Sequence, residues 1–519
     1  MTAPQKFTDT GRMRAINPRT WEVLAELEPM PTAHLTTAIT TCRHAQKLWS
    51  AQSLKSRCHA LQEVMHRVVE RGDELALAVR REQGKSTAEA YFSEVMGAAT
   101  TIQTHLKYDP KWLKSKRVAI DPLSYPGKRG RVERRPRGLI GLITPWNYPL
   151  ALPMRTIVPA LLAGNGVLFK PSEHSMLVAE AIGDLFQDVL PEGLLQVLQG
   201  GGELGAALAQ SPALDALVFT GSVTTGREVA RAAAANLCPL SLELGGKDAA
   251  IVCVDADLDR SAAGIAWAAF HNTGQNCAAV ERVYVEDSVH DAFVQRLIEA
   301  TNQLRTEGDP ELVEVGPLCN QRQFDLVQRQ VEEAVARGAR VLAGGKPTGE
   351  GWGFQPTLLA DVPDDCSIWH EETFGPVLPI ARVHSVYEAV DRTNASPFGL
   401  SASIWGQDLG RAESLGRRCE VGMALVNNHA FTGSIANAPW VGTKESGTGV
   451  TGSELALGFL TRPQLVVLDK SRVKEVWWFP LNPAALALAR TLLASLVAPI
   501  GKRISLLVRL LGLLSRRWK

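Results

Sequence analysis

The stretch LIGLITPWNYPLALPMRTIVPALLAGNGVLFK, residues 139–170, decides the fold. It opens with the apolar run LIGLI (139–143) and closes with GVLFK (166–170), and the residues between them, which include PALLAGN, are helical in pattern. A strand, a helix and a second strand form the unit from which parallel sheets with helix-covered faces are built. The stretch therefore predicts an α/β fold.

The same alternation continues along the chain. Further apolar runs of strand length are LLQVL (194–198), ALVFT (216–220) and PLSLEL (239–244). A second alternating block begins near AAIVC (249–253) and ends near residue 444. Within it, we expect the helix SVHDAFVQRLIEATNQLR to start from Asp287 or Ser288 as N-cap, and the helix NQRQFDLVQRQVEEAVARG to end at Gly338.

Two segments before residue 139 have other patterns. From about residue 31 to 105, apolar residues recur at spacings of three and four, which predicts helices. The segment RVAIDPLSYPGKRGRVERRP (117–136) has short extended pieces separated by Pro and Gly turns, which predicts a β-hairpin.

Composition limits the classes of protein and partner. With 519 residues, the chain is too long for one ordinary core, so at least two domains are expected. A net charge of +1 excludes a global basic field, so we expect no nucleic-acid partner. None of the eight cysteines lies in a CxxC or a zinc-like Cys/His spacing, so we expect free thiols, no metal and a reducing compartment. The N-terminus has no apolar run, so no signal peptide is expected and the location is predicted to be cytoplasmic.

Residues with reactive or polar side chains follow the predicted strands. Open parallel sheets bind ligands at the carboxyl ends of their strands, so these residues are candidates for a site. In TPWNYP (144–149), two prolines stiffen the loop around Asn147, whose amide is a neutral donor suited to an oxyanion; the alternative is an Asx-type turn. In FKPSE (169–173), Lys170 and Glu173 are suited to ribose hydroxyls; the alternative is an ordinary solvated pair.

Two glycine-containing turns follow. FTGSVTTG (219–226) joins a strand to a helix N-terminus, which binds phosphate; it is no P-loop, because Arg227-Glu228 replaces the required Lys-Ser/Thr. In LELGGK (242–247), Glu243 ends an apolar strand, where a raised pKa suits a general base; the alternative is a carboxylate facing solvent.

The stretch HNTGQNCAAVERV (271–283) contains one thiol, Cys277, among small neighbours. One interpretation is a buried cysteine that packs as a small hydrophobe. The other is a nucleophile that needs room for a substrate carbon.

Taken in order, TPWN, KPSE, FTGS, ELGGK, GQNC and EETFGP (371–376) resemble the NAD(P)-dependent aldehyde dehydrogenase superfamily over about residues 15–470. PWVGTKESGTG (439–449) is similar to the family's closing motif. The resemblance implies a Rossmann-type cofactor domain plus an α/β catalytic domain, with a β-hairpin oligomerisation element and a C-terminal amphipathic helical tail.

The resemblance also implies a division of the chain. It predicts an N-terminal helical part of the cofactor-binding domain (1–117), an oligomerisation hairpin (118–136), a Rossmann-type cofactor-binding domain (137–245), a catalytic domain (246–444), a return to the core with an oligomerisation strand (445–475) and an amphipathic membrane-associating tail (476–519).

By resemblance, Cys277 is the nucleophile that forms a thiohemiacetal and then a thioester, Asn147 stabilises the oxyanion, and Glu243 activates the hydrolytic water. The implied cofactor-binding residues are Thr144, Trp146, Lys170, Ser172, Glu173, Gly201, Gly221, Ser222, Leu244, Glu372 and Phe374. NAD is the expected cofactor and NADP the alternative, because the charge of Glu173 would repel a 2′-phosphate.

The chain departs from the family pattern at four positions. Thr156 stands where a lysine is common, nine residues after Asn147, and Thr451 stands where a glutamate is common. In family members that carry both, these residues are linked to a proton relay from the general base. Trp440 and Val441 replace a phenylalanine and a glycine, which predicts a reshaped substrate tunnel.

The segment from Val476 to Lys519 contains no acidic residue and seven basic ones, namely Arg490, Lys502, Arg503, Arg509, Arg516, Arg517 and Lys519. On a helical wheel, Lys502, Ser505, Arg509, Gly512 and Arg516 form a polar stripe. Ile504, Leu506, Leu507, Val508, Leu510, Leu511, Leu513 and Leu514 cover the rest, as in interfacial helices.

The aromatic residues of this tail, Trp477, Trp478, Phe479 and Trp518, suit a headgroup region. The apolar part from Ala484 to Val497 is too short for a confident transmembrane span. Some fatty-aldehyde-oxidising members of the superfamily resemble this plan, and the alternative is a helix packed on a partner subunit.

The sequence therefore predicts NAD-dependent oxidation of an apolar, medium- to long-chain aldehyde to the carboxylate. The enzyme is expected to be a homodimer or homotetramer in the cytoplasm, in peripheral contact with a membrane through its tail. The alternatives are a coenzyme A-acylating aldehyde dehydrogenase, which commonly lacks the residue equivalent to Glu243, and a catalytically inactive membrane-bound scaffold.

Overall fold

The computed structural model describes residues 3–121, 124–472 and 474–517. Trp518 and Lys519 of the predicted tail lie outside the described residues, as does the side chain of Leu507. The chain forms two compact units. The first contains the residues up to Lys114 together with Arg134–Arg462, and the second contains Ser115–Glu133 and the chain from Pro463 onward.

The first unit contains a five-stranded parallel sheet with the order β7-β6-β5-β8-β9. Its strands are β5 (Leu139–Ile143), β6 (Gly166–Lys170), β7 (Leu195–Val197), β8 (Ala216–Thr220) and β9 (Leu240–Glu243). Its helices are α6 (Ala151–Leu162), α7 (Met176–Phe186), α8 (Gly202–Ala209) and α9 (Val223–Ala235). The predicted strand–helix alternation is confirmed, and β5, β6 and β8 are buried throughout because helices cover both faces.

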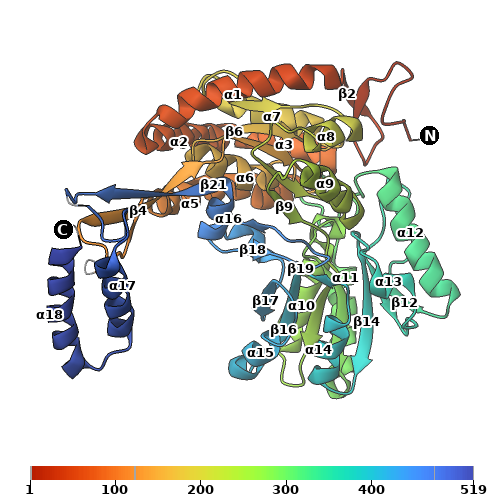
Figure 1. Cartoon of the computed structure of the whole chain (residues 1–519). Helices are drawn as coiled ribbons and strands as arrows, with labels where there is room; N and C mark the ends of the chain where they lie inside the picture. Colours follow the sequence, from red (N-terminus) through yellow and green to blue (C-terminus); the bar gives the residue numbers. More distant parts are fainter. Residues whose placement is uncertain (1–2, 122–123, 473, 518–519) are drawn as a thin grey trace. The chain divides into compact units, whose positions relative to one another are not determined.

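The residues before this sheet form the predicted helices, α1 (Leu35–Ala51), α2 (Leu54–Glu70), α3 (Gly72–Gln83), α4 (Thr87–Ala90), a π-helical turn at Tyr91–Val95 and α5 (Met96–Trp112) (Figure 1). Ser53 caps α2 by accepting a hydrogen bond from the Ser56 amide at 3.1 Å. Two short strands, β1 (Met13–Ile16) and β2 (Val23–Leu27), pair antiparallel ahead of α1.

The same unit contains a seven-stranded sheet with the order β12-β13-β14-β11-β10-β16-β17. Its strands are β10 (Asp248–Val252), β11 (Val280–Glu286), β12 (Arg340–Ala343), β13 (Thr357–Ala360), β14 (Val377–Val383), β16 (Ser401–Trp405) and β17 (Met423–Val426). Only β12 runs antiparallel to its neighbour among these described strands.

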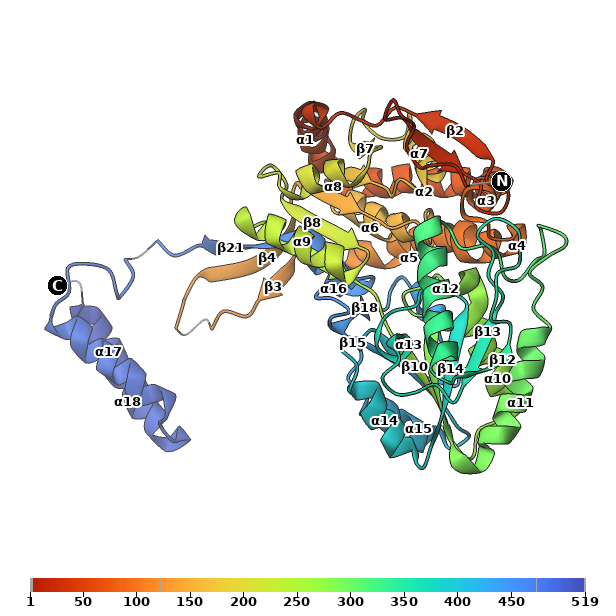
Figure 2. The same ribbon diagram turned by 90° about the vertical axis from the view of Figure 1, so that its right-hand side faces the viewer.

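Helices cover both faces of this second sheet (Figure 2). One face carries α10 (Leu258–Phe270) and α11 (His290–Asn302); the other carries α12 (Gln321–Ala336), α13 (Ser367–His370), α14 (Val386–Asn394) and α15 (Leu409–Gly416). Along β10, Ala249 and Ile251 join one core and Ala250 and Val252 the other, as strand alternation requires.

The predicted start of α11 is wrong. Residues Asp287–Val289 form a 3₁₀ turn, and α11 begins at His290 without a capping side chain. The Asp287 carboxylate instead accepts a hydrogen bond from Arg382 on β14 at 2.6 Å, and this pairing keeps it from the helix amides. The predicted end of α12 is confirmed, since Gly338 follows the helix with a left-handed φ of 105°.

Short pairs close the first unit. They are β15 (Phe398–Gly399) with β19 (Thr443–Lys444), and β18 (Trp440–Val441) with β20 (Val450–Thr451), followed by α16 (Ser453–Leu460).

A three-stranded sheet has the order β21-β4-β3. The predicted hairpin is confirmed as β3 (Lys116–Val118) and β4 (Lys128–Pro136), which pair antiparallel. The edge strand β21 (Thr461–Asp469) follows α16 in the sequence. The domain boundaries expected from the sequence remain predictions.

The tail forms two helices, α17 (Pro483–Leu496) and α18 (Ile500–Arg516), which pack on each other (Figure 1). Asn482 caps α17 by accepting a hydrogen bond from the Ala485 amide at 2.9 Å. Within the described part of the chain, no helix is long and apolar enough to cross a membrane. Arg517 is buried and donates hydrogen bonds to the carbonyls of Val476, Trp478 and Pro480, so it is not a surface cation.

Candidate active site

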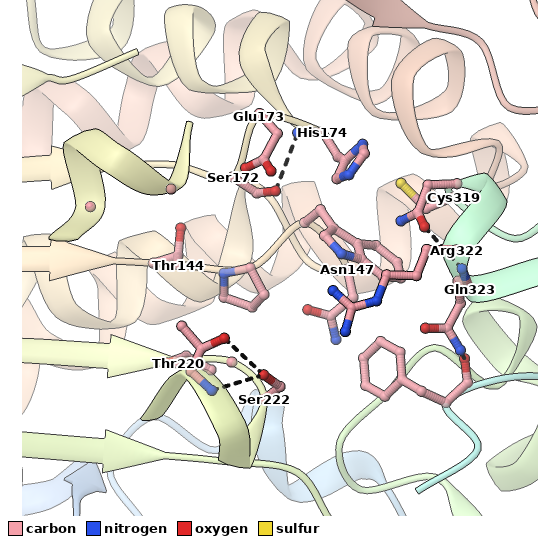
Figure 3. A pocket seen from close by; sticks show the side chains of 18 of the residues that line it. Thr144, Asn147, Ser172, Glu173, His174, Thr220, Ser222, Cys319, Arg322 and Gln323 are labelled. Atoms are coloured by element: carbon pink, nitrogen blue, oxygen red, sulfur yellow. Dashed lines mark hydrogen bonds between the residues drawn. The ribbon is translucent and has the colours of Figure 1, made fainter. Parts of the chain in front are cut away.

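A cavity of about 1710 Å³ lies at the carboxyl ends of β5, β6, β8 and β9. Figure 3 shows side chains that project into it from the ends of β5, β6 and β8 and from α12. It brings together the predicted residues Thr144, Trp146, Asn147, Lys170, Ser172, Glu173, Gly221, Ser222, Glu243, Leu244, Cys277, Glu372 and Phe374. Gly201 is not on the wall; it precedes α8 as N-cap, and its neighbours Gly202 and Gly205 line the cavity.

One end of the cavity carries the pair from FKPSE. The Lys170 ammonium lies 3.7 Å from the Glu173 carboxylate. Burial lowers the pKa of Lys170, and the charge of Glu173 partly offsets this. Burial raises the pKa of Glu173, but His174, Lys170 and Lys6 outweigh it, so the pKa lies below its ordinary value. Glu173 is therefore an ionised acceptor at the site expected to hold a ribose.

Lys6 and His174 belong to this end of the cavity, and sequence reasoning missed both. The Lys6 ammonium donates a hydrogen bond to the Arg14 carbonyl at 2.5 Å. Burial lowers the pKa of Lys6, and the charge of Glu82 acts against this. Burial lowers the pKa of His174 to about 4, so the imidazole is neutral near pH 7. No local motif signals Lys6, because it reaches the site from the distant N-terminal segment.

The middle of the cavity suits a pyrophosphate. Ser222 caps α9 by accepting a hydrogen bond from the Thr225 amide at 3.3 Å, and both residues line the wall. A Cβ on Gly202, the first residue of α8, would meet no atom within 4 Å, so the backbone there is open to a ligand. The buried Thr144 hydroxyl has no hydrogen-bond partner among the described residues. Helix N-termini with open amides bind anions, so this arrangement fits a dinucleotide.

The other end of the cavity has an aromatic wall. The rings of Trp146 and Phe374 meet edge to face, with centroids 5.6 Å apart. Phe374 has a left-handed φ of 49°, and the Glu281 carboxylate holds it by accepting from its amide at 2.8 Å. Glu372 accepts from the Gly246 amide at 3.0 Å, and burial raises its pKa to about 8. A Cβ on Gly245 would lie 2.3 Å from Glu372, so a side chain there would displace this carboxylate.

Asn147 and the Cys277 loop are joined by two amide hydrogen bonds. The Asn147 side chain donates to the Gln275 carbonyl at 3.0 Å, and the Asn272 side chain donates to the Asn147 carbonyl at 3.0 Å. Asn272 and Thr273 both have left-handed backbones, with φ of 52° and 58°. The cross-bonds hold this strained turn against the stiff TPWNYP loop, which fixes Cys277 relative to Asn147.

Cys277 is half-buried, and the small residues Ala278 and Ala279 beside it are buried. Burial raises the pKa of its thiol well above the ordinary value, and the nearby carboxylates of Glu243, Glu372 and Asp248 raise it further. The thiol is therefore neutral near pH 7, and a base must accept its proton before it can act as a nucleophile.

A second cavity of about 1030 Å³ also reaches Cys277. The two cavities share Leu152, Thr220, Glu243, Leu244 and Cys277. Most other side chains of the second wall are apolar, including Phe92, Trp267, Phe270, Leu304, Phe431 and Trp440. Cys277 and Glu243 thus lie where a cofactor-sized cavity meets a separate, largely apolar one.

Glu243 is buried, and one of its carboxylate oxygens has no hydrogen-bond partner within the described residues. Burial raises its pKa, while Arg155 and the Thr451 hydroxyl lower it. Sequence reasoning missed Arg155. Among the described residues, no group of three or more His, Cys, Asp or Glu side chains is placed to hold a metal ion.

Comparison with known proteins identifies the family. Residues 6–466 match the model of the "Aldehyde dehydrogenase family". The chain belongs to this family. It is an NAD(P)-dependent aldehyde dehydrogenase, an oxidoreductase that acts on aldehydes. The α/β aldehyde dehydrogenase fold implied by the sequence resemblance is thereby confirmed.

Three relatives describe the similarity of this aldehyde dehydrogenase. It is 36% identical to 4,4′-diapolycopene aldehyde oxidase of Methylomonas sp. over 471 residues, covering 90% of this chain and 88% of the other. It is 36% identical to glutarate-semialdehyde dehydrogenase of Pseudomonas putida over 457 residues, covering 86% and 93%. The crystal structure of an E. coli NADP-dependent enzyme is similar with a TM-score of 0.85 and 31% identity, covering 90% and 96%.

Proposed function

We propose that this aldehyde dehydrogenase oxidises an apolar, medium- to long-chain aldehyde to its carboxylate, with Cys277 as nucleophile. The observation that carries the proposal is the meeting of the two cavities at Cys277 and Glu243. An aldehyde in the apolar cavity and a dinucleotide in the other would reach the same sulfur from two sides.

The wall of the second cavity supports an apolar substrate. Aromatic and aliphatic side chains dominate it, and burial of each additional substrate CH₂ is worth about 0.8 kcal/mol. The relative from Methylomonas is named for a diapolycopene aldehyde, whereas the Pseudomonas putida relative is named for a semialdehyde. Charged side chains on the wall include Arg155, Glu89, Arg305 and Glu314, so a carboxylated aldehyde is the comparator that distinguishes the two substrate classes.

Acylation would begin when a hydroxide ion of the solvent takes the proton of the thiol and the thiolate attacks the aldehyde carbon. The oxyanion of the resulting thiohemiacetal would lie near the Asn147 amide. One N–H of that amide donates to the Gln275 carbonyl, and the second N–H remains for the oxyanion.

The predicted residues of the first cavity would hold NAD(P), and the bound cofactor would supply a hydride acceptor for the thiohemiacetal carbon. Loss of the hydride leaves a thioester on Cys277. Glu243 would take a proton from the water that attacks this thioester, and the carboxylate product would leave the restored thiol. Burial of Glu243 suits this role, because a raised pKa strengthens the base.

A second copy of the chain is the proposed partner of the β21-β4-β3 sheet. The edge strand β21 exposes three apolar side chains, Leu465, Val467 and Leu468. An exposed apolar edge strand is a template for strand pairing. A homodimer or homotetramer built through this strand would cover them, and light scattering of Leu465→Lys measures whether the assembly is lost.

The tail is proposed to dock on an anionic membrane surface. On α18, Ile500, Ile504, Val508 and Leu511 form one stripe at helical spacing and are each more than 60% exposed. Five basic side chains of the tail are exposed, namely Arg490, Lys502, Arg503, Arg509 and Arg516. An apolar stripe with flanking cations is the pattern of interfacial helices.

A turnover screen tests the substrate class. We expect kcat/KM to rise from propanal to dodecanal, by up to about fourfold per CH₂ when each is fully buried. Succinate semialdehyde is the carboxylated comparator. A kcat/KM for succinate semialdehyde above that of every alkanal would reject the apolar substrate.

A further inference from the structure

Arg155 on α6 is a buried cation at the catalytic end of the second cavity. One end of its guanidinium, Nη1, donates a hydrogen bond to the Gly433 carbonyl at 2.7 Å. The other two nitrogens, Nε and Nη2, have no hydrogen-bond partner among the described residues. A cation with unused donors is costly to bury unless it faces negative charge.

The guanidinium is fixed by what surrounds it. Its central carbon lies 5.4 Å from the centroid of the Trp440 ring. A Cβ on Gly452 would lie 3.3 Å from Nη2, so the backbone packs closely there. Trp440 on β18 pairs in register with Thr451 on β20, which precedes Gly452. Arg155 therefore lies against Trp440, the register partner of Thr451, and close to Gly452, the residue that follows Thr451.

The Thr451 hydroxyl lowers the pKa of the Glu243 carboxyl, which places it beside that carboxylate. The titratable groups that face Glu243 from neighbouring elements are Arg155 and Cys277. Thr156, next to Arg155 on α6, is buried and uncharged. Arg155 and Glu243 both line the second cavity, so Arg155 is the cation on the same wall as this carboxylate. It stands one position before Thr156, where the family resemblance leads one to expect a lysine.

We propose that Arg155 is a positioning residue for Glu243: its guanidinium supplies the positive charge that Thr156 does not, and it holds the segment that presents Thr451. The inference rests on the proposed role of Glu243 as general base. Without the Arg155 charge, the pKa of Glu243 rises further, because burial raises this pKa and the guanidinium no longer lowers it. Glu243 then stays protonated up to a higher pH. Hydrolysis of the thioester then needs a more alkaline solution.

An activated ester tests this without cofactor. With 4-nitrophenyl acetate, the Cys277 thiolate attacks the ester carbonyl, expels 4-nitrophenolate and forms a thioester, which needs no oxidant. Water then cleaves the thioester to acetate, and its proton passes to Glu243. The burst of 4-nitrophenolate measures acylation, and the slower linear phase measures deacylation across pH.

We expect Arg155→Met to keep the burst amplitude and to move the rise of the linear phase to higher pH by about one pH unit or more. Arg155→Lys should stay near the wild type, since it keeps the charge. Arg155→Gln, which keeps donors without the charge, should behave like Arg155→Met and replaces it if the methionine variant does not fold. Arg57→Met is the matched control, because it removes a partly buried arginine that donates to the Leu162 carbonyl at the end of α6.

The proposal is overturned if the deacylation rate of Arg155→Met and Arg155→Gln rises at the same pH as that of the wild type. It is also overturned if Arg155→Lys or Arg57→Met moves that pH as far as the neutral variants do. A rise in KM for succinate semialdehyde alone, with unchanged deacylation, would also overturn it and assign Arg155 to substrate binding. Glu243→Gln separates the two claims. If the linear phase of Glu243→Gln keeps the wild-type pH dependence, Glu243 is not the base. If Glu243→Gln loses that dependence while the pH dependence of Arg155→Met equals that of the wild type, only the proposed role of Arg155 is wrong.

Discussion

The exposed apolar stripe of α18 makes membrane docking a quantitative prediction. Its four side chains, Ile500, Ile504, Val508 and Leu511, are already on a formed helix, so docking does not have to order the chain. Full burial of an aliphatic side chain is worth about 1.5–3 kcal/mol, so half-insertion of four of them gives roughly 3–6 kcal/mol. Each cation near anionic lipid adds about 1 kcal/mol.

The test is flotation of the full chain with vesicles that contain phosphatidylserine. Ile504→Glu combined with Val508→Glu places two carboxylates in the stripe and should weaken binding by more than about a hundredfold, the equivalent of about 3 kcal/mol. Ser505→Glu, on the polar stripe, is the matched control and should cost only about fivefold through its charge. Binding of the full chain should also weaken as salt rises from about 0.05 to 0.5 M, because salt screens the cations.

Equal flotation of the stripe variant and the wild type would refute the reasoning, as would absence of flotation in the wild type. If the wild type does not float, light scattering of the Ile504→Glu, Val508→Glu variant shows what the stripe contacts instead. A smaller number of subunits in this variant than in the wild type would mean that the stripe packs on a protein partner.

The active site gives three further predictions. Cys277→Ala should lose at least about a thousandfold in turnover while NAD binding, followed by fluorescence, persists; near-normal turnover would contradict this. NAD should be preferred over NADP, because the ionised Glu173 would repel a 2′-phosphate. Lys6→Met should widen that preference, because the charge of Lys6 partly offsets the charge of Glu173. A higher kcat/KM with NADP in the wild type would contradict this. Acylation, measured as the NADH burst, should rise steadily into alkaline pH because burial raises the pKa of Cys277, and a burst rate that is flat above pH 7 would contradict this.

Local patterns predicted the scaffold. Strands such as β5 and β6 are buried on both faces, so an uninterrupted apolar run identifies each of them without knowledge of its neighbours. The site residues at strand ends, such as Asn147 and Glu243, could be predicted for the same reason, because parallel strands place their carboxyl ends at one edge.

Residues that reach the site by tertiary contact could not be predicted in this way. Lys6 approaches Glu173 from the N-terminal segment, and Arg155 lies in a helix whose other residues are nearly all buried and apolar. The predicted start of α11 is wrong for a related reason, since Asp287 pairs with Arg382 on a strand far along the chain. In the tail, Leu506, Leu510 and Leu513 are half-buried in the α17–α18 pair, so the free apolar face is narrower than the helical wheel predicts.

The central claim is that substrate carbon becomes attached to Cys277. The direct measurement is mass spectrometry of Glu243→Gln after brief reaction with decanal and NAD, followed by acid quenching and proteolysis. Because this variant lacks the proposed base for hydrolysis, the account predicts a decanoyl thioester on the peptide that contains Cys277, in near-stoichiometric amount. An unmodified Cys277 peptide together with continued NADH formation, or an acyl group on another residue, would contradict it.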